Sequence, residues 1–408
     1  MTPTLEDARR FDAEDPLSGF RDRFVAPDDE GIVAYLDGNS LGRPPKATLA
    51  RLDSLVRGEW GTGLIRSWSE GWMELPVQVG DRLGAAALGA APGQVVVADS
   101  TSVCLYKVLR AAVALRPGRT EIVTDRHNFP TDNYVVQGVA DELGLAVRWI
   151  DSDPEGGVTA EELAAVLSER TAVVVLSHVA YRSAFIADMA AITELGHSCG
   201  ALVVWDLCHS VGSVPVELDA LGVDFAVGCT YKFLNAGPGA PAFVYVRAEH
   251  QEAFRQPIWG WMGSDLPFAM EHGYQPAAGV RRALSGTPPI TGMVGVDEGV
   301  ALVAEAGIDR IRAKAVELGE MVIELADEWL VPLGMRVASP RDAELRGGHV
   351  TVARADGEEL SRRLIDDGVI IDFRPPDGIR IGLSPLTTSF AETWQAMDAM
   401  RRIAAEGR

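Results

Sequence analysis

The sequence predicts an α/β protein whose larger part contains a mostly parallel seven-stranded sheet, followed by a smaller α+β unit. Between residues 94 and 246, short runs rich in Val and Ile alternate with amphipathic stretches of helical length. Strands that are apolar throughout and separated by helices are typical of a parallel sheet covered on both faces. At 408 residues, the chain also exceeds the size of a typical single core, so we expect two domains.

The expected elements follow one another along the chain. The seven strands of the large sheet are expected at 95–97, 121–123, 147–150, 172–176, 201–205, 225–227 and 242–246. The helices between them are expected at 102–115, 132–143, 160–167 and 189–199. Residues 259–289 are rich in Gly and Pro and are expected to form an irregular crossover. One long helical segment is expected to follow at 290–329. The small unit is completed by strands and helices at 336–338, 350–352, 358–367, 369–373, 379–383 and the C-terminus.

These elements divide the chain into three parts. Residues 1–50 are expected to form an N-terminal arm that joins the small domain, residues 51–289 the large domain, and residues 290–408 the small C-terminal domain. The composition, 47% hydrophobic and 23% charged, is that of an ordinary globular protein. A formal net charge of -21 repels phosphate backbones and anionic lipid, which argues against nucleic acid and membrane partners.

Cysteine usage and the N-terminus predict a cytoplasmic protein. The four cysteines, Cys104, Cys199, Cys208 and Cys229, form no CxxC pair, so reduced thiols and no metal site are the plain interpretation. The first twenty residues contain several acids and no apolar core, unlike a signal peptide. The apolar runs elsewhere have the length of strands and are too short to span a membrane.

The most informative residues follow two of the expected strands. Asp206 and His209 come directly after the strand at 201–205, and Lys232 lies in a loop of small residues after the strand at 225–227. Ligands of open α/β sheets bind beyond such carboxyl ends of strands. A pyridoxal phosphate enzyme needs a lysine amine for the cofactor's aldehyde and a carboxylate that keeps its pyridine nitrogen protonated. Each residue alone has a plainer interpretation as a solvated, capping or packing side chain, but together they favour the cofactor.

Two further segments follow neighbouring strands. Thr101 and Ser102 open a helix, where hydroxyls and free amides serve equally well to bind a phosphate or to cap the helix. Phe129 could stack on a flat cofactor ring, with Asp132 beside it. A capped helix start, with Thr131 or Asp132 at the cap, is the stronger interpretation of that segment by itself.

Arg380 lies on a strand of the expected small domain. A guanidinium on one face of a half-buried strand suits bidentate capture of a substrate carboxylate. From this segment alone, a surface ion pair is the preferred interpretation.

Taken in order along nearly the whole chain, eight segments resemble the kynureninases, a family of fold-type-I pyridoxal phosphate enzymes in the same broad class as the class-V aminotransferases and cysteine desulfurases. The segments are 36–42, 63–68, 128–132, 205–210, 228–237, 260–263, 286–290 and 378–380. The resemblance implies hydrolytic cleavage of the Cβ–Cγ bond of L-kynurenine or 3-hydroxykynurenine. The products would be anthranilate or 3-hydroxyanthranilate and L-alanine, in tryptophan catabolism or NAD biosynthesis.

The resemblance also implies roles for individual residues. Lys232 would be the Schiff-base lysine, Asp206 the partner of the pyridine nitrogen and Tyr231 an acid/base. The other residues implied to contact the cofactor are Thr101, Ser102, Phe129, Pro130, Thr131, Asp132, Ser177 and His209.

The remaining implied residues concern the neighbouring subunit and the substrate. Trp261 and Thr287 would reach the phosphate from that subunit, which makes the protein a homodimer with shared sites. Arg380 would hold the substrate carboxylate, with Ser40 and Trp68 near the aryl ketone.

The chain departs from the family pattern at Ser264, where the family usually has His, and at Ala180 and Cys104, near which it usually has Asn. These changes concern aryl-ring specificity and the positioning of the phosphate, so a ring-substituted kynurenine is an alternative substrate. A cysteine desulfurase is a second alternative. That reaction needs a nucleophilic cysteine in the small domain, whereas all four cysteines precede residue 230.

Overall fold

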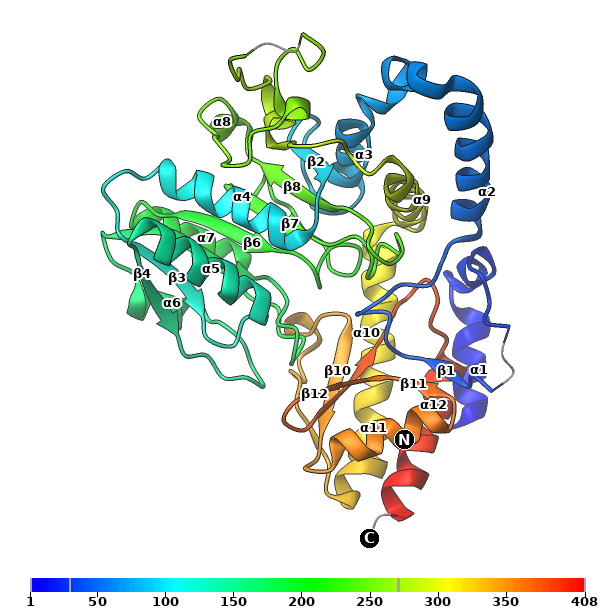
Figure 1. Ribbon diagram of the computed structural model, residues 1–408. Coiled ribbons are helices and arrows are strands. Elements are labelled where there is room, and N and C mark those ends of the chain that lie inside the picture. The colour runs from blue at the N-terminus through cyan, green and yellow to red at the C-terminus, as the bar shows by residue number, and fades with distance from the viewer. Residues whose placement is uncertain (1, 29–30, 270–271, 407–408) are drawn as a thin grey trace.

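The computed structural model describes residues 2–28, 31–269 and 272–406, and its larger part is a seven-stranded sheet between helices (Figure 1). The strand order is β2-β8-β7-β6-β5-β3-β4. Strand β8 runs antiparallel to β2 and β7, whereas every other neighbouring pair is parallel. The strands are β2 Val95–Ala98, β3 Glu121–Asp125, β4 Ala146–Ile150, β5 Thr171–Ser177, β6 Leu202–Asp206, β7 Phe225–Gly228 and β8 Ala242–Val246.

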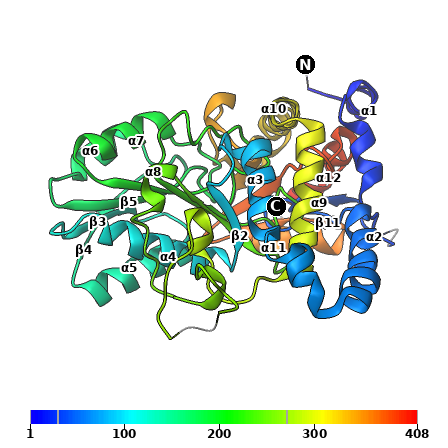
Figure 2. The ribbon, with the colours of Figure 1, turned by 90° about the horizontal axis from the view of Figure 1, so that it is seen from above.

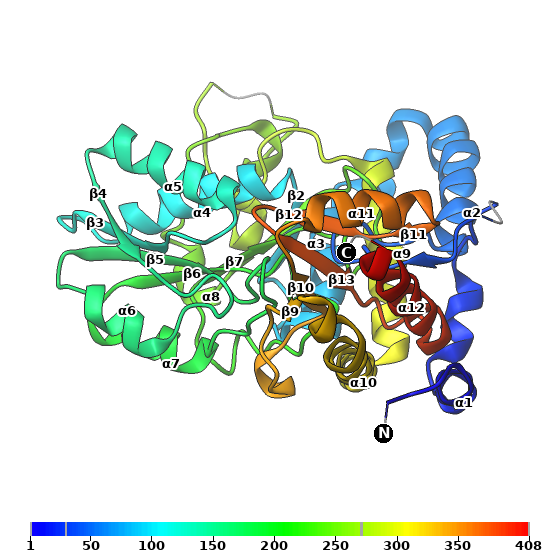
Figure 3. The same ribbon diagram turned by 90° about the horizontal axis from the view of Figure 1, so that it is seen from below.

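Both faces of this sheet are covered by helices. Along β6, Val203 and Trp205 belong to one apolar core, whereas Leu202 and Val204 belong to another, because successive side chains point to opposite faces. Figures 2 and 3 show α4 and α5 on one face and α6 and α7 on the other. The helices of this unit are α3 Leu75–Leu83, α4 Thr101–Ala114, α5 Pro130–Leu143, α6 Ala160–Val166, α7 Met189–Ser198 and α8 Ala248–Gln251.

A second, antiparallel sheet has the strand order β12-β13-β10-β9. Its strands are β9 Arg336–Val337, β10 His349–Ala353, β12 Asp372–Arg374 and β13 Gly378–Gly382. The residues Val350, Val352, Ile379 and Ile381 alternate along β10 and β13 and are buried in one core. That core is covered by α10 Ile308–Leu325, α11 Gly357–Asp366 and α12 Phe390–Glu406 (Figure 3). The other face of the sheet is therefore left for polar residues.

The N-terminal segment joins both units. Helix α1 (Leu5–Glu14) packs on α12, with the rings of Phe11 and Phe390 5.6 Å apart, and the two-residue strand β1 (Ala34–Tyr35) pairs in parallel with β11 (Val369–Ile370). Helix α2 (Lys46–Ser54) lies beside α9 (Ile290–Ala306). The domain boundaries near residues 50 and 290 stay predictions. None of the helices in the described ranges is long and apolar enough to cross a membrane.

Two expectations about the second unit are wrong. The segment 290–329 is not one helix, because Gly307, with φ of 81°, separates α9 from α10. The expected strand 369–373 is divided at Ile371. Its first part, β11, pairs with β1, whereas its second part, β12, pairs with β13. A pattern of local hydrophobicity does not show which partner each half of such a strand finds.

Helix α9 supports the loop that carries Lys232. A Cβ at Gly295 would collide with the carbonyl oxygen of Ala236, and one at Gly299 would collide with that of Leu234. Because backbone atoms cannot turn aside as a flexible side chain can, the close approach of this helix to the loop requires glycine at both positions.

We expect Gly299→Ala to destabilise the protein by about 1–3 kcal/mol, because the added methyl group forces the helix and the loop apart. Gly138→Ala is the matched control, since Gly138 lies on an exposed part of α5 with no heavy atom within 4 Å of an added Cβ. The control should be neutral or stabilising by up to about 1 kcal/mol. Urea unfolding measures both, and a Gly299→Ala protein as stable as the wild type would show that α9 does not constrain the loop.

Candidate active site

Two polar side chains lie side by side at the carboxyl ends of β5 and β6. Ser177 and Asp206 are paired residues in the register of these strands. Asp206 is buried, and its Oδ1 accepts a hydrogen bond of 2.6 Å from the backbone N–H of Cys208. No α-helix begins there in the described chain, so Asp206 stabilises a turn and does not cap a helix.

Lys232 lies in the loop after β7 and points toward the same edge of the sheet. Its Nζ is 3.2 Å from Nε2 of His209 and 5.9 Å from the centroid of the Phe129 ring. The loop turns back through Asn235 at φ of 56° and Gly237 at φ of 95°. The structure therefore brings Lys232, His209 and Phe129 together, as the sequence predicts.

Lys232 differs from the other lysines in its partners. The chain has four lysines. Lys107 and Lys314 are buried, and each forms an ion pair with a carboxylate, at 2.5 and 2.7 Å, whereas Lys46 is exposed. Among the lysines withdrawn from solvent in the described residues, Lys232 alone has no ion-pair partner. Its amine is thus the one left available for a ligand.

Asp132 lies against Asp206. Burial raises the pKa of Asp132 well above its ordinary value, and the neighbouring Asp206 carboxylate raises that pKa further. Its Oδ2 is buried and accepts no hydrogen bond in the described structure. Two adjacent buried carboxylates need a proton or a cation between them. The protonated pyridine nitrogen of pyridoxal phosphate is such a cation, so these residues fit the cofactor, and Lys232, whose charge acts on Asp132, is the amine available for its aldehyde.

The start of α5 corrects one expectation. The helix begins at Pro130 with Phe129 as its N-cap residue, so Thr131 and Asp132 both lie inside the first turn. Neither residue caps the helix, and the expectation of a cap there is wrong. Pro130 at the first position supplies no N–H and needs no cap, which frees Asp132 to face the site.

Asn128 is a site residue that sequence reasoning missed, although it belongs to the recognised segment 128–132. Its Oδ1 accepts hydrogen bonds from the Ser177 hydroxyl, at 2.6 Å, and from the backbone N–H of Phe129, at 2.8 Å. It thereby fixes the end of β5 relative to the start of α5. The sequence feature that could have identified Asn128 is its position, as a polar residue three places after a fully buried strand.

The start of α4 is suited to an anion. Ser100 is the N-cap residue, yet its side chain makes no capping hydrogen bond. The first amides of a helix without such a cap, with their positive partial charge, attract phosphate. Thr101 is half-buried, with Oγ1 3.8 Å from Sγ of Cys208, and Ser102 is exposed. Of the two interpretations left open by the sequence, the geometry favours phosphate binding.

Two polar groups next to Lys232 are kept uncharged. Burial lowers the pKa of His209 well below its ordinary value, and the charge of Lys232 lowers it further. Burial also raises the pKa of the Tyr231 hydroxyl, which therefore keeps its proton. The backbone carbonyl of Tyr231 accepts a 2.8 Å hydrogen bond from Gly42 N–H, which joins the segment containing Ser40 to this loop.

Arg380 approaches from the small sheet and is not a surface residue. It is only 1% exposed, so the interpretation as a surface ion pair is wrong. Its Nη1 donates to the carbonyl oxygen of Tyr181 at 2.9 Å, and its Nη2 donates to Oγ of Ser40 at 2.8 Å. The ring of Tyr181 also packs edge-on against Phe129, with 5.4 Å between centroids. Tyr181, which sequence reasoning missed, thus connects the cofactor residues to Arg380.

Three predicted residues lie apart from this group. Trp68 packs edge-on against Trp72, and Trp261 packs edge-on against Phe268. Thr287 is exposed. In the described structure, none of the three makes a hydrogen bond or ring contact with Lys232, Asp206 or Arg380, so their roles stay predictions.

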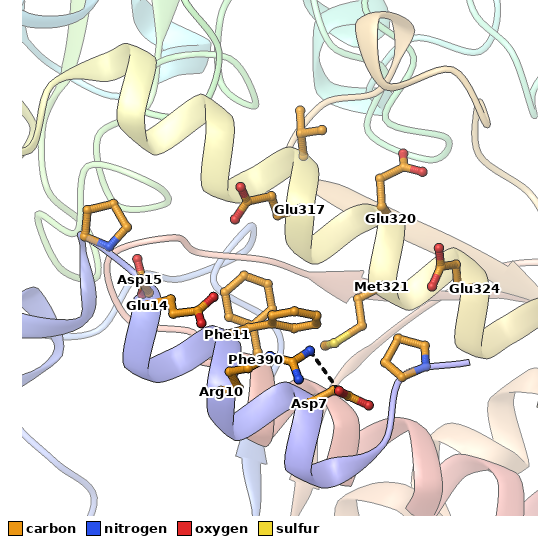
Figure 4. A pocket seen from close by; sticks show the side chains of 13 residues that line it. Asp7, Arg10, Phe11, Glu14, Asp15, Glu317, Glu320, Met321, Glu324 and Phe390 are labelled. Carbon is orange, nitrogen blue, oxygen red and sulfur yellow. Dashed lines mark ion pairs between the residues drawn. The ribbon is translucent and has the colours of Figure 1, made fainter. Parts of the chain in front are cut away.

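A separate cavity of about 790 Å³ lies between α1 and α10 (Figure 4). Its apolar lining includes Phe11, Met321 and Phe390, and carboxylates such as Glu317 lie around them. Its one arginine, Arg10, is paired with Asp7 at 2.8 Å. None of the predicted site residues lines this cavity, so its size alone does not make it the active site.

The chain is similar to known proteins over nearly its whole length. The family model described as aminotransferase class-V matches residues 84–372. A kynureninase from Pseudomonas fluorescens is 44% identical, with 98% of this chain and 95% of that protein covered. A kynureninase from Burkholderia pseudomallei (strain K96243) is 41% identical over the same shares.

Solved structures share the fold at lower identity. A cysteine desulfurase from Thermococcus onnurineus NA1 has a TM-score of 0.80 at 20% identity, with 91% of this chain and 95% of that chain covered. A C-DES mutant that carries glycine covalently linked to its PLP cofactor has a TM-score of 0.78 at 18% identity, covering 92% and 99%. These neighbours confirm the predicted fold class.

His178 gives this part of the fold a pH dependence that can be measured. Its backbone N–H donates to the Asp206 carbonyl, its Nδ1 lies 2.9 Å from Oγ of Ser210, and burial lowers its pKa to about 4. Because this folded-state pKa lies below the unfolded value near 6.5, only the unfolded chain takes up a proton between pH 6.5 and 4. Stability is therefore complete above that range and is lost as the pH falls through it.

We expect His178→Gln to make the loss of unfolding free energy between pH 7 and 5 smaller by about 2 kcal/mol, since glutamine cannot titrate. Urea unfolding at the two pH values measures this difference. His272→Gln, at an exposed position, is the control and should leave the difference unchanged. Equal slopes for wild type and His178→Gln would contradict a buried neutral histidine at this position.

Proposed function

The chain belongs to the kynureninases, within the class-V aminotransferase fold, and we propose that it uses pyridoxal phosphate to hydrolyse the Cβ–Cγ bond of L-kynurenine to anthranilate and L-alanine. Identity of 44% over 98% of the chain supports the reaction. The structural observation that carries the site assignment is that the charges of Lys232 and Arg380 both act on the buried His209, while Asp206 and Lys232 both act on Asp132.

Pyridoxal phosphate, when bound, supplies an aldehyde for the substrate amine and a ring that accepts electrons. Asp206, with Asp132 beside it, would hold the proton on the pyridine nitrogen. Lys232 would bind the aldehyde through its amine and would serve as the base for the proton on the substrate α-carbon. The N-terminus of α4, with Thr101 and Ser102, binds the phosphate.

The substrate side is formed by the small sheet and the segment 36–42. Arg380 and Ser40, hydrogen bonded to each other, bind the α-carboxylate, which orients the ketone carbon toward Tyr231. Tyr231 keeps its proton because burial raises its pKa, so its hydroxyl can donate that proton to the ketone oxygen as water adds, and recover one from that water. When the Cβ–Cγ bond breaks, the β-carbon gains a proton and the diol loses one to become the carboxylic acid.

The test of this function is product analysis of the purified holoenzyme. Offered L-kynurenine, 3-hydroxykynurenine and other ring-substituted kynurenines in turn, it should release an anthranilate and L-alanine in equal amounts, and the ratio of kcat/KM values identifies the preferred ring. Release of sulfide and alanine from L-cysteine, without cleavage of any kynurenine, would instead select a desulfurase. The four cysteines argue against that reaction, since all of them lie outside β9 to α12.

Lys232→Ala should lower anthranilate release by at least about a thousandfold, because both the cofactor's amine partner and the α-proton base are removed. Lys46→Ala, at the exposed lysine, is the matched control and should retain wild-type turnover. The assay follows anthranilate fluorescence under saturating pyridoxal phosphate. Near-normal turnover by Lys232→Ala would contradict the assignment.

We also propose a homodimer whose active sites are shared. Large apolar side chains are exposed on two segments at the upper end of the molecule in Figure 1: Trp60, Leu64 and Ile65 before α3, and Trp259, Leu266 and Phe268 after α8. Large apolar side chains exposed on neighbouring positions of a segment are typical of a subunit interface. Trp261 lies within the second segment, which suits its predicted reach to the neighbouring subunit's phosphate.

Subunit mixing tests the shared site. Lys232→Ala and Trp261→Ala homodimers should each be impaired, whereas a mixed dimer contains one site with both residues intact, so random mixing should restore about a quarter of wild-type activity. Mixing Lys232→Ala with Asp206→Asn is the control, because these two residues come from one subunit and no intact site forms. Equal recovery in both mixtures, or none in the first, would contradict a site completed by the partner's Trp261.

A place in tryptophan catabolism or NAD biosynthesis and a cytoplasmic location follow from the same proposal, and both stay predictions.

A further inference from the structure

The small sheet presents a row of polar side chains to the large unit. Thr351 of β10 is paired in register with Arg380 of β13, which is paired in turn with Asp372 of β12. Paired residues point to the same face of a sheet, opposite to the apolar face that carries Val350 and Ile379. The polar face meets the large unit directly, since Thr351 Oγ1 donates to the Arg182 carbonyl and Arg380 donates to the Tyr181 carbonyl.

The only ion pair of Arg380 in the described structure is with Asp372. Its Oδ2 forms an ion pair with Nη2 of Arg380 and a second one, at 2.9 Å, with Nε of Arg374. Asp37 also faces this group, behind Ser40, but it forms no ion pair with Arg380 among the described residues. The Nε of Arg380 is buried and donates to no atom of the described chain. The Nε donor of Arg380 is therefore free, whereas Nη1 and Nη2 each contact a partner.

We propose that Asp372 is a positioning residue for the substrate carboxylate: it fixes the guanidinium of Arg380 before the substrate arrives, in the orientation that leaves a donor free. This inference rests on the proposed function, in which Arg380 binds that carboxylate. Asp372 does not itself touch the substrate in this account.

The geometry indicates that Asp372 orients Arg380 for the substrate and does not compete with the substrate for it. An arginine side chain has many rotamers, and a site in which it is already ordered binds its ligand more tightly than one that must order it. Because Asp372 is shared with Arg374, its single charge is divided between two guanidinium groups, and Arg380 keeps part of its attraction for an anion. A carboxylate that belonged to Arg380 alone would compete with the substrate instead.

Two ligands that differ only in the carboxylate test the proposal. L-alanine, a product of the proposed reaction, carries the group that Arg380 would bind, and ethylamine is the same molecule without it. Both are titrated into the holoenzyme while the cofactor absorbance is followed. The variants are Asp372→Asn, which keeps the size and removes the charge, and Asp372→Ser as a second replacement. Asp377→Asn is the matched control, because Asp377 lies in the same hairpin but pairs with Arg336 at 2.9 Å.

We expect both Asp372 variants to bind L-alanine about tenfold more weakly, with ethylamine affinity unchanged, and to raise the KM for L-kynurenine more than they lower kcat. Asp377→Asn should match the wild type. Unchanged or tighter L-alanine binding would overturn the proposal, the latter by showing that Asp372 competes for Arg380. An equal loss for both ligands would also overturn it, as general damage to the site. If the Asp372 variants lose affinity for L-alanine alone, as expected, but the wild type cleaves no kynurenine, the proposed function fails while the role of Asp372 in binding an amino-acid carboxylate stands.

Discussion

The burial of the Arg380 guanidinium between two sheets is the constraint on which the rest of the structure depends. A charge withdrawn from water must be paired and hydrogen bonded, or it costs several kcal/mol of stability. Here the partners come from segments far apart in the sequence: Ser40, the Tyr181 carbonyl and Asp372. Satisfying this one side chain therefore fixes the N-terminal segment, the loop after β5 and strand β12 relative to one another.

At the opposite end of the site, the buried carboxylates of Asp132 and Asp206 require a positive partner, which the cofactor's protonated ring supplies. The two ends are held at a fixed separation by the segment 36–42. Its Ser40 accepts from Arg380, and its Gly42 N–H donates to the Tyr231 carbonyl beside Lys232. The site thus has a guanidinium at one end, Arg380, and a pair of carboxylates at the other, Asp132 and Asp206. This arrangement suits an amino acid bound to a pyridinium cofactor, because the arginine can bind its carboxylate and the aspartates can bind the ring nitrogen.

The sequence predicts the strands, the covering helices and the residues at strand ends, because alternation of apolar runs and the position after a strand are local properties. Lys232, Asp206 and His209 could be found in this way. The break at Gly307 also had a local signal, because a glycine within a helical pattern readily adopts the positive φ that ends a helix. The turn of Asp132 toward Asp206 and the division of 369–373 could not be predicted, because each is decided by a partner distant in sequence. The pairing of Asp372 with Arg380 could not be predicted for the same reason, because the two residues come into register only in the folded hairpin. The positions of Trp68, Trp261 and Thr287 relative to the substrate stay predictions.

The most direct test of the account is to find which lysine holds the cofactor. Borohydride reduction of the holoenzyme fixes the pyridoxyl group on the amine that binds it, and peptide mass spectrometry then locates the label among the four lysines. The account predicts label on Lys232 alone, because Lys107 and Lys314 are held by carboxylates and Lys46 lies on the surface. Label on any of these three, with Lys232 unmodified, would contradict a site between the two sheets.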